Sequence, residues 1–190
     1  MRGMVYLCGG RDDKGVTSKE VFAFSVTDGT WAEKREPDLN IGRIDHGVCV
    51  QGDRIFVICG YSYSHGFLDS IEMLDLSVER KRSFLGGESG RVWKLFTVGP
   101  LTPRQNPSVA PLGNSKILVM GGYHEERFPN GNEGTEEEKA ATTFQSISYL
   151  SDAVIIDVND CVKEEPQLAC NINPNELEAF LAISGTPFSF

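Results

Sequence analysis

Short apolar runs that end in glycine recur three times in the chain, and they constrain its fold more than any other feature. The runs are MVYLCGG (residues 4–10), RIFVICGY (54–61) and KILVMGGY (116–123). Their glycines Gly9, Gly60 and Gly121 lie 51 and 61 residues apart. A period near 50 residues is too long for a repeat of paired helices and fits a repeated small β-sheet.

Each repeat predicts four strands. After each glycine a polar loop leads to an outer strand: VFAFSV (21–26), IEMLDL (71–76) and DAVIIDV (152–158). In two repeats a tryptophan-bearing segment follows: TWAEKREP (30–37) and VWKLFTVGPL (92–101). A further run precedes the second and third glycines: HGVCVQGD (46–53) and PSVAPLGNS (107–115). The glycine-terminated runs are continuously apolar, which predicts burial on both faces of each sheet. Glycine there permits close backbone approach and positive φ.

This order of elements resembles the kelch repeat over roughly residues 4 to 168. The shared elements are the doublets Gly9-Gly10 and Gly121-Gly122, an aspartate in the outer strand (Asp75 and Asp157), Trp31 and Trp93, and the inter-repeat Arg43 and Arg104. Tyr61 stands where a second glycine is expected, and the third repeat lacks a tryptophan. The resemblance implies an all-β fold, a partial kelch-type β-propeller of about three four-stranded blades.

The repeats divide the chain into four parts. We expect blade 1 at residues 1–42 without its first strand, blade 2 at 43–104, blade 3 at 105–170 with a long acidic insertion at 124–151, and a tail at 171–190. The tail predicts a short amphipathic helix over residues 174–184, with Asn173 as its cap and Pro174 in its first turn. The insertion exceeds the usual loop length, so it is either a partner-contact element or a spacer. Thr135 and Glu138 could form a capping box within it.

Three blades are too few for a closed ring, because propellers typically have four to eight. Uncovered end sheets would cost on the order of 10 kcal/mol if each exposes several hundred Å² of apolar surface. We therefore expect either a piece of a longer kelch protein or a chain whose protein partner, or a second copy, completes the propeller.

A candidate binding face lies where the loops between second and third strands meet the links between repeats. Chain direction in a meander places these segments at one end of the blades. The candidate residues are Arg43, Tyr61, Tyr63, His65, Arg104, Tyr123, His124 and Arg127. Kelch propellers similar to this chain often bind peptides or proteins through that face, with arginines facing acidic motifs. Arg43 and Arg104 could instead hold neighbouring loops through carbonyl groups.

Charge and cysteine content narrow the class of protein. Residues 124–190 hold 3 basic and 13 acidic side chains, whereas residues 1–123 hold 15 and 14, so the net charge of −9 is concentrated in the final third. Such an acidic region disfavours nucleic-acid binding. No apolar stretch approaches the roughly 20 residues that span a bilayer. An odd count of five cysteines, with no signal peptide visible, favours a cytoplasmic protein.

Residues that could support catalysis are sparse. The three histidines show no metal-ligand spacing, and no nucleophile elbow or Cys-x-x-Cys pattern occurs. Some kelch-like propellers are enzymes, but their ligand sets cannot be located here. We therefore expect no catalytic residue, no metal and no cofactor. The sequence favours a protein–protein interaction module of the adaptor type, with a structural subunit of a large complex as the alternative. No BTB or F-box segment is visible, so a ligase role would depend on sequence elsewhere.

Overall fold

The computed structural model describes residues 3–33, 36–78, 81–82, 88–128, 144–159 and 170–171, and this part of the chain contains strands, turns and connecting loops. The expected helix at 174–184 and the capping box at Thr135 lie outside the described residues. None of the elements in the described ranges is a helix that could span a membrane.

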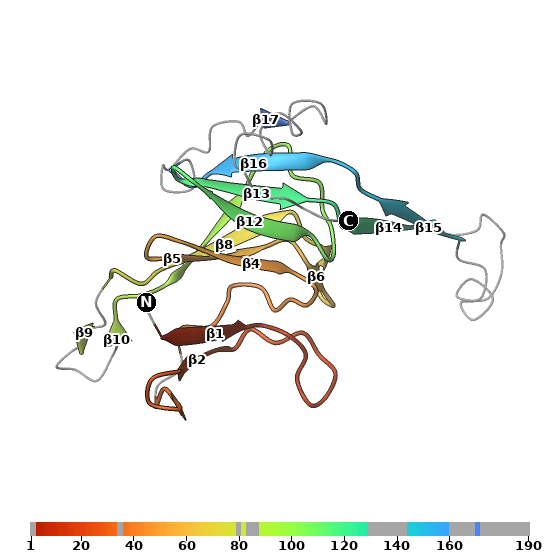
Figure 1. Cartoon of the computed structure of the whole chain (residues 1–190). Helices are drawn as coiled ribbons and strands as arrows, with labels where there is room; N and C mark the ends of the chain where they lie inside the picture. The colour runs from red at the N-terminus through yellow and green to blue at the C-terminus, as the bar shows by residue number, and fades with distance from the viewer. Residues whose placement is uncertain are drawn as a thin grey trace.

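Three antiparallel meander sheets form the body of the molecule (Figure 1). Blade 1 contains β1 (Met4–Cys8), β2 (Val21–Ser25) and β3 (Thr30–Trp31) in that order. Blade 2 contains β4 (Gly47–Gln51), β5 (Arg54–Ile58), β8 (Ser70–Asp75) and β11 (Trp93–Thr97). Blade 3 contains β12 (Ser108–Gly113), β13 (Lys116–Met120), β16 (Ala153–Asp157) and β17 (Cys170–Asn171). The all-β class and the partial propeller are thus confirmed.

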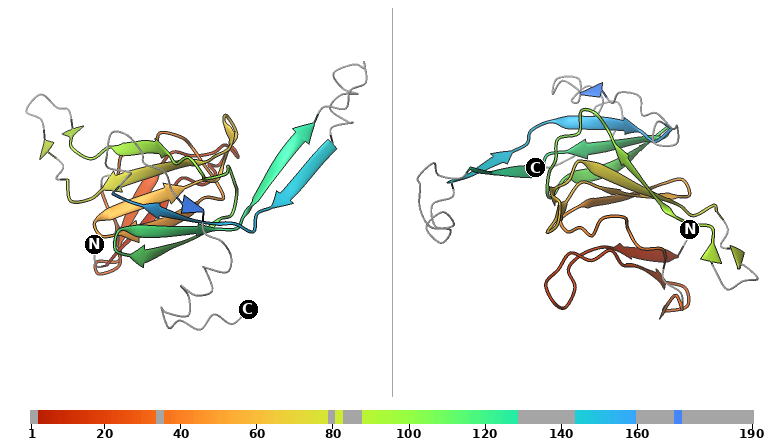
Figure 2. Two further views of the ribbon diagram at one scale, coloured as in Figure 1. Left: turned by 90° about the horizontal axis from the view of Figure 1, so that it is seen from above. Right: turned by 180° about the vertical axis from the view of Figure 1, so that it is seen from behind.

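Three two-stranded sheets lie in the connections between the strands of blades 2 and 3. They are β6 (Tyr61–Ser62) with β7 (Gly66–Phe67), β9 (Lys81–Arg82) with β10 (Glu88–Ser89), and β14 (Tyr123–Phe128) with β15 (Phe144–Tyr149). The last pair begins and ends the insertion of blade 3. The sequence predicts a long insertion with a capping box, and this two-stranded ribbon is not among its predictions. Figure 2 shows β14 and β15 projecting away from the three blades.

Strand β5 of blade 2 is buried on both faces, as its continuous apolar run predicts. Ile55 and Val57 of β5 lie in a cluster with Val21 of blade 1, and all three are 0% exposed. Phe56 and Ile58, which alternate with them, join the cluster that contains Ile117 of blade 3. Alternate side chains of a strand point to opposite faces, so one strand fills both inter-blade cores.

The inner strands of blades 2 and 3 approach each other closely. A β-carbon added to Gly47 at the start of β4 would overlap the Val109 side chain of β12. A small residue at this position therefore allows the two inner strands to pack side by side.

The glycine doublet is shifted by one residue from the expected alignment in blade 2. The first positions are Gly9, Cys59 and Gly121, with φ of 63°, 59° and 61°, and the second are Gly10, Gly60 and Gly122, with φ of 101°, 95° and 92°. The residue that replaces a glycine is thus Cys59 at the first position, and not Tyr61 at the second. The φ near 60° lies in the left-handed region that non-glycine residues occasionally adopt, whereas values near 95° favour glycine strongly.

Candidate protein-interaction surface

Arg43 lies inside the protein and is 0% exposed. Its guanidinium donates to the Cys59 carbonyl at 2.9 Å, to the Ser70 carbonyl at 3.2 Å and to the Glu72 carboxylate at 2.7 Å. Burial lowers the pKa of Arg43, and the Glu72 carboxylate acts in the opposite direction. Arg43 was expected either to bind an acidic partner motif or to hold neighbouring loops through carbonyl groups. The structure contains the carbonyl contacts of the second role.

Arg104 repeats this arrangement in blade 3. Its guanidinium donates to the Gly121 carbonyl at 3.0 Å and to both carboxylate oxygens of Asp152 at 2.7 Å. The Arg104 side chain is 0% exposed, and that of Asp152 is 36% exposed. Neither inter-repeat arginine therefore presents its charge to an acidic motif at the surface.

Glu72 was missed by the sequence reasoning. Its carboxylate is 0% exposed and accepts hydrogen bonds from the backbone N–H groups of Asn40 and Ile41 at 2.6 and 3.0 Å, in addition to that from Arg43. The signal was available, because a glutamate in the middle of the apolar strand IEMLDL needs a buried partner. Glu72 ties the link between blades 1 and 2 to β8.

A row of contacting rings crosses the same end of the blades, and we call it the aromatic row. It begins with Tyr63 and Tyr61, whose ring centroids are 5.7 Å apart, and continues from Tyr61 to Phe67 at 5.3 Å. Phe67 contacts both Tyr123, at 6.2 Å, and His124, at 4.7 Å. Tyr149 ends the row, 6.4 Å from Tyr123. The structure thus brings together four of the predicted residues, Tyr61, Tyr63, Tyr123 and His124, and adds Phe67 and Tyr149.

The two ends of the aromatic row are open to solvent. Tyr63 is 51% exposed and Tyr149 is 82% exposed, while the rings between them are half-buried. At the first end the Arg11 guanidinium of blade 1 lies 5.7 Å from the centre of the Tyr63 ring, within cation–π range. The row therefore extends from a blade 1 loop to the base of the β14–β15 ribbon.

Two predicted residues stand apart from this row. His65 is exposed, and its Nδ1 lies 2.8 Å from the Ser64 hydroxyl at the tip of the β6–β7 turn. Arg127 belongs to β14 and is paired in register with Gln145, but its side chain lies outside what the structure describes.

The surroundings of the aromatic row are acidic. Burial raises the pKa of the Tyr123 hydroxyl, and the carboxylates of Asp45 and Glu125 raise it further. Asp12 and Asp13, next to Arg11 in the chain, are exposed. The guanidinium groups of Arg43 and Arg104 are buried and add no positive charge to this surface.

The two tryptophans that the repeats share differ in their burial. Trp93 is 6% exposed, lies in the core between blades 1 and 2, and donates from Nε1 to the Pro37 carbonyl at 2.8 Å. Trp31 is 55% exposed and packs edge-on against Phe24 of its own blade at 5.2 Å.

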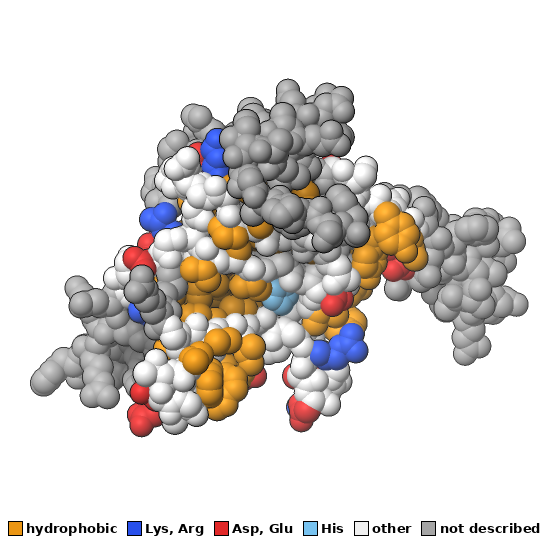
Figure 3. Space-filling view, viewed as in Figure 1, with side chains coloured by type: hydrophobic (Ala, Val, Ile, Leu, Met, Phe, Trp, Pro, Cys, Tyr) orange, Lys and Arg blue, Asp and Glu red, His pale blue; other side chains and the backbone are white. Residues whose placement is uncertain are grey.

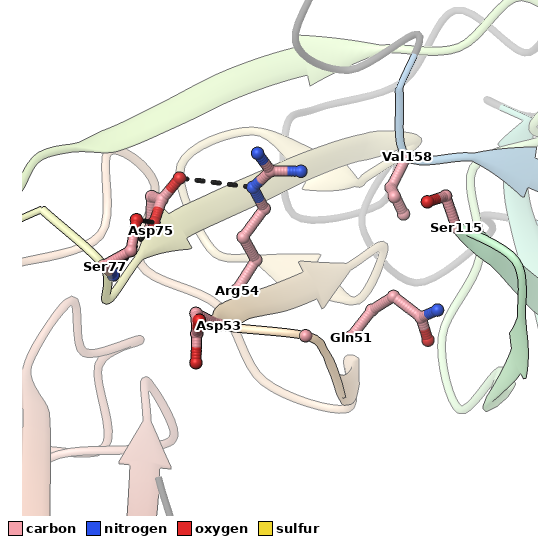
Figure 4. Close-up of a pocket in the computed structure, with 8 residues that line it drawn as sticks. Gln51, Asp53, Arg54, Asp75, Ser77, Ser115 and Val158 are labelled. Carbon is pink, nitrogen blue, oxygen red and sulfur yellow. Dashed lines mark hydrogen bonds and ion pairs between the residues drawn. The ribbon is translucent and has the colours of Figure 1, made fainter.

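A pocket of about 240 Å³ lies at the opposite end of blades 2 and 3 (Figure 4). It is lined by Gln51, Gly52, Asp53, Arg54, Asp75, Ser77, Ser115 and Val158. Arg54 donates to Asp75 at 3.2 Å, and Asp75 also accepts the Ser77 hydroxyl, so two of the charged side chains of the pocket bind each other. Among the described residues no group of three His, Cys, Asp or Glu side chains could hold a metal ion.

Comparison with known proteins agrees with this architecture. Residues 42–80 match the family model of the Kelch motif. This segment contains β4, β5 and β8 together with Arg43, the Cys59-Gly60 doublet and Glu72. A search of curated proteins found no match to the chain. The chain thus carries a kelch motif within an all-β fold that is consistent with a partial β-propeller.

Proposed function

We propose that the chain is a protein–protein interaction module of the kelch-propeller type, which acts as an adaptor. Its binding face is the end of the blades that carries the aromatic row. The observation that supports this proposal is the continuity of that row, because exposed tyrosines and an arginine over a ring are the side chains that dominate binding energy at protein interfaces. The function needs neither catalysis nor a cofactor.

The chemistry of the aromatic row favours a partner segment with apolar and basic side chains. The open faces of Tyr63 and Tyr149 can stack against such groups. The carboxylates of Asp45 and Glu125 near Tyr123 would repel an acidic segment. This differs from the arginine-based recognition that the resemblance implies.

The insertion at 124–151 is proposed as a second contact element. Ile147 and Tyr149 in β15 are 51% and 82% exposed and continue the aromatic row onto the ribbon. Deleting residues 126–147 should abolish partner binding and leave the β-sheet circular dichroism of the blades intact. Retained binding would show that the insertion is a spacer.

The aromatic row can be tested by a double substitution, Tyr63→Ala with Tyr149→Ala. Both side chains are largely exposed, so the variant should fold normally. We expect partners captured from a lysate by the tagged chain to fall at least tenfold, measured by quantitative mass spectrometry. Val92→Ala, 63% exposed on another part of blade 2, serves as the matched control and should capture the same partners as the wild type. Equal capture by all three chains would contradict the proposal.

A structural subunit of a larger assembly is the second candidate, and one observation favours it. The face of blade 1 that points away from blade 2 exposes Val5, Leu7, Phe22 and Trp31 at 47%, 51%, 38% and 55%. A partner protein or a second copy that covers this face would complete more of the propeller. Stoichiometric co-purification with a fixed assembly would identify a structural subunit, whereas exchangeable ligands would identify an adaptor.

We place this function in the cytoplasm. Cys8, Cys49 and Cys59 are free thiols in or against the cores of the blades. Free thiols of this kind suit a reducing compartment.

A further inference from the structure

Strand β1 is an edge strand, and this sets blade 1 apart from the other two blades. Among the described strands β1 pairs with β2 alone. The equivalent strands β5 and β13 each carry an additional inner strand, β4 and β12 respectively. An unpaired strand edge presents N–H and C=O groups that can pair with an incoming strand.

Two exposed valines lie next to this edge. Val48 and Val50 of β4 are 43% and 44% exposed, although their cross-strand partners Val57 and Ile55 are 0% exposed. Directly opposed residues share a face, so both valines face the blade 1 side, where Ile55 and Val57 pack. Figure 3 shows apolar side chains at the surface over blade 1 and the adjoining part of blade 2.

The neighbouring inter-blade contact shows what covers a β4-like strand. Val109 of β12 stands five residues after Arg104, as Val48 stands five residues after Arg43. Val109 packs against Gly47, the residue four after Arg43. If blades 1 and 2 pack as blades 2 and 3 do, a strand added to β1 would place a small residue against Val48, as Gly47 lies against Val109.

The repeat also predicts an arginine in that strand. In blades 2 and 3 the arginine side chain binds two groups. One is the carbonyl of the first doublet residue, Cys59 or Gly121, and the other is the side chain of the residue that pairs with it, Ser70 or Asp152. In blade 1 these positions are Gly9 and Glu20. The Gly9 N–H donates to the Glu20 carbonyl at 2.9 Å, as Cys59 does to Ser70 at 3.0 Å and Gly121 does to Asp152 at 3.2 Å. Glu20 thus stands at the position in blade 1 that Asp152, which binds Arg104, holds in blade 3.

We propose that β1 binds a β-strand of a partner protein in antiparallel register. The partner segment has an arginine, three further residues, a glycine or other small residue, and then a short strand of alternating apolar side chains. Its backbone pairs with β1, its strand covers Val48 and Val50, and its arginine binds the Gly9 carbonyl and the Glu20 carboxylate. This proposal rests on the second proposed function, a partner that completes the open side of blade 1, and is independent of the aromatic row.

The test uses a fluorescent peptide with the sequence of residues 41–53, IGRIDHGVCVQGD, in which the cysteine is replaced by serine. This segment is the chain's own example of the required pattern. We expect saturable binding to the full chain by fluorescence anisotropy, and new hydrogen-exchange protection of amides in residues 4–8. A peptide with Arg43→Gln should bind at least tenfold more weakly, and one with Gly47→Val likewise. A peptide of scrambled sequence is the control.

Variants of the chain locate the site. Val50→Asp should abolish peptide binding, and Glu20→Gln should weaken it several-fold while circular dichroism stays unchanged. If Val50→Asp fails to fold, the Glu20→Gln measurement still tests the arginine contact. The Tyr63→Ala, Tyr149→Ala chain should bind the peptide normally, so failure at β1 and failure of the aromatic row are distinguishable. Absent binding, equal binding of the scrambled peptide, or a self-dimer that the peptide cannot compete away would each overturn the proposal.

Discussion

The guanidinium of Arg43 lies 2.7 Å from the carboxylate of Glu72, and neither side chain is exposed to solvent. The arginine belongs to the link between blades 1 and 2, and the glutamate belongs to β8 of blade 2. The same carboxylate accepts two backbone N–H groups of the link, from Asn40 and Ile41. One buried ion pair therefore fixes how the chain passes from one blade to the next.

Glu72→Gln should destabilise the protein strongly, because it leaves the buried Arg43 charge without a counter-charge. Breaking a buried pair costs roughly 3–5 kcal/mol. Arg54→Gln is the matched control, since the Arg54–Asp75 pair is 31% and 25% exposed and such pairs contribute about 1 kcal/mol or less. The measurement is the free energy of unfolding in urea. Similar small losses in both variants would mean that Glu72 does not carry the inter-blade link.

Gly60→Ala should cost more stability than Gly10→Ala, although both glycines have φ near 100°. An alanine at either position suffers backbone strain of about 1–3 kcal/mol. A β-carbon at Gly60 would in addition lie 2.5 Å from the Ile44 carbonyl oxygen, whereas one at Gly10 meets nothing within 4 Å. The difference between the unfolding free energies of the two variants, measured in urea, separates the cost of the contact with the Ile44 carbonyl from the cost of the backbone strain. Equal losses would show that backbone conformation alone selects glycine here.

The blades were predictable from the sequence because their signal is local. A continuous apolar run such as RIFVIC predicts a strand that is buried on both faces, and the glycine that follows indicates where the strand ends. The alignment that places Tyr61 at the second doublet position was wrong, although the sequence contains the signal. RIFVICGY and KILVMGGY align residue for residue with Cys59 opposite Gly121, and Cys59 has the left-handed φ that Gly9 and Gly121 have.

The candidate surface was only partly predictable because burial depends on contacts between distant segments. Tyr61 and Tyr123 follow equivalent doublets, so the sequence placed them at one end of the blades. Arg43 and Arg104 share that end, yet their side chains turn inward to carbonyl groups 16 and 17 residues away. Tyr149 lies at this surface because β14 pairs with β15. The sequence of the long acidic insertion does not predict this pairing.

His46 should make the packing of blades 1 and 2 sensitive to acid. The pKa of His46 is lowered from 6.5 to about 4, first by burial and then by the Arg43 charge, while backbone hydrogen bonds with Cys8 and Arg43 act in the opposite direction. Its Nδ1 is buried without a hydrogen-bond partner. In the unfolded chain His46 is therefore protonated near pH 6.5, whereas in the folded chain it is protonated only near pH 4.

The stability that neutral His46 provides is fully present above pH 6.5 and is lost as the pH falls to about 4, on the order of 3 kcal/mol. The Asp75 pKa is lowered from 3.8, so that carboxylate titrates below this window. We expect His46→Gln to flatten the fall in unfolding free energy between pH 6.5 and 4, measured by urea titration at several pH values. His65→Gln, at an exposed site, is the control. An unchanged pH profile in His46→Gln would refute this assignment.

The thiols of Cys8, Cys49 and Cys59 should resist alkylation in the folded protein. Burial raises the pKa of each to about 12, and the thiolate is the reactive form. Cys59 is the sharpest case, because the Arg104 and Arg43 charges lower its pKa but do not overcome burial. We expect no modification of these three residues by iodoacetamide at pH 8, by peptide mapping, and full modification in urea. Rapid labelling of Cys59 in the folded chain would mean that the two arginines activate it, and that the doublet of blade 2 is open to solvent.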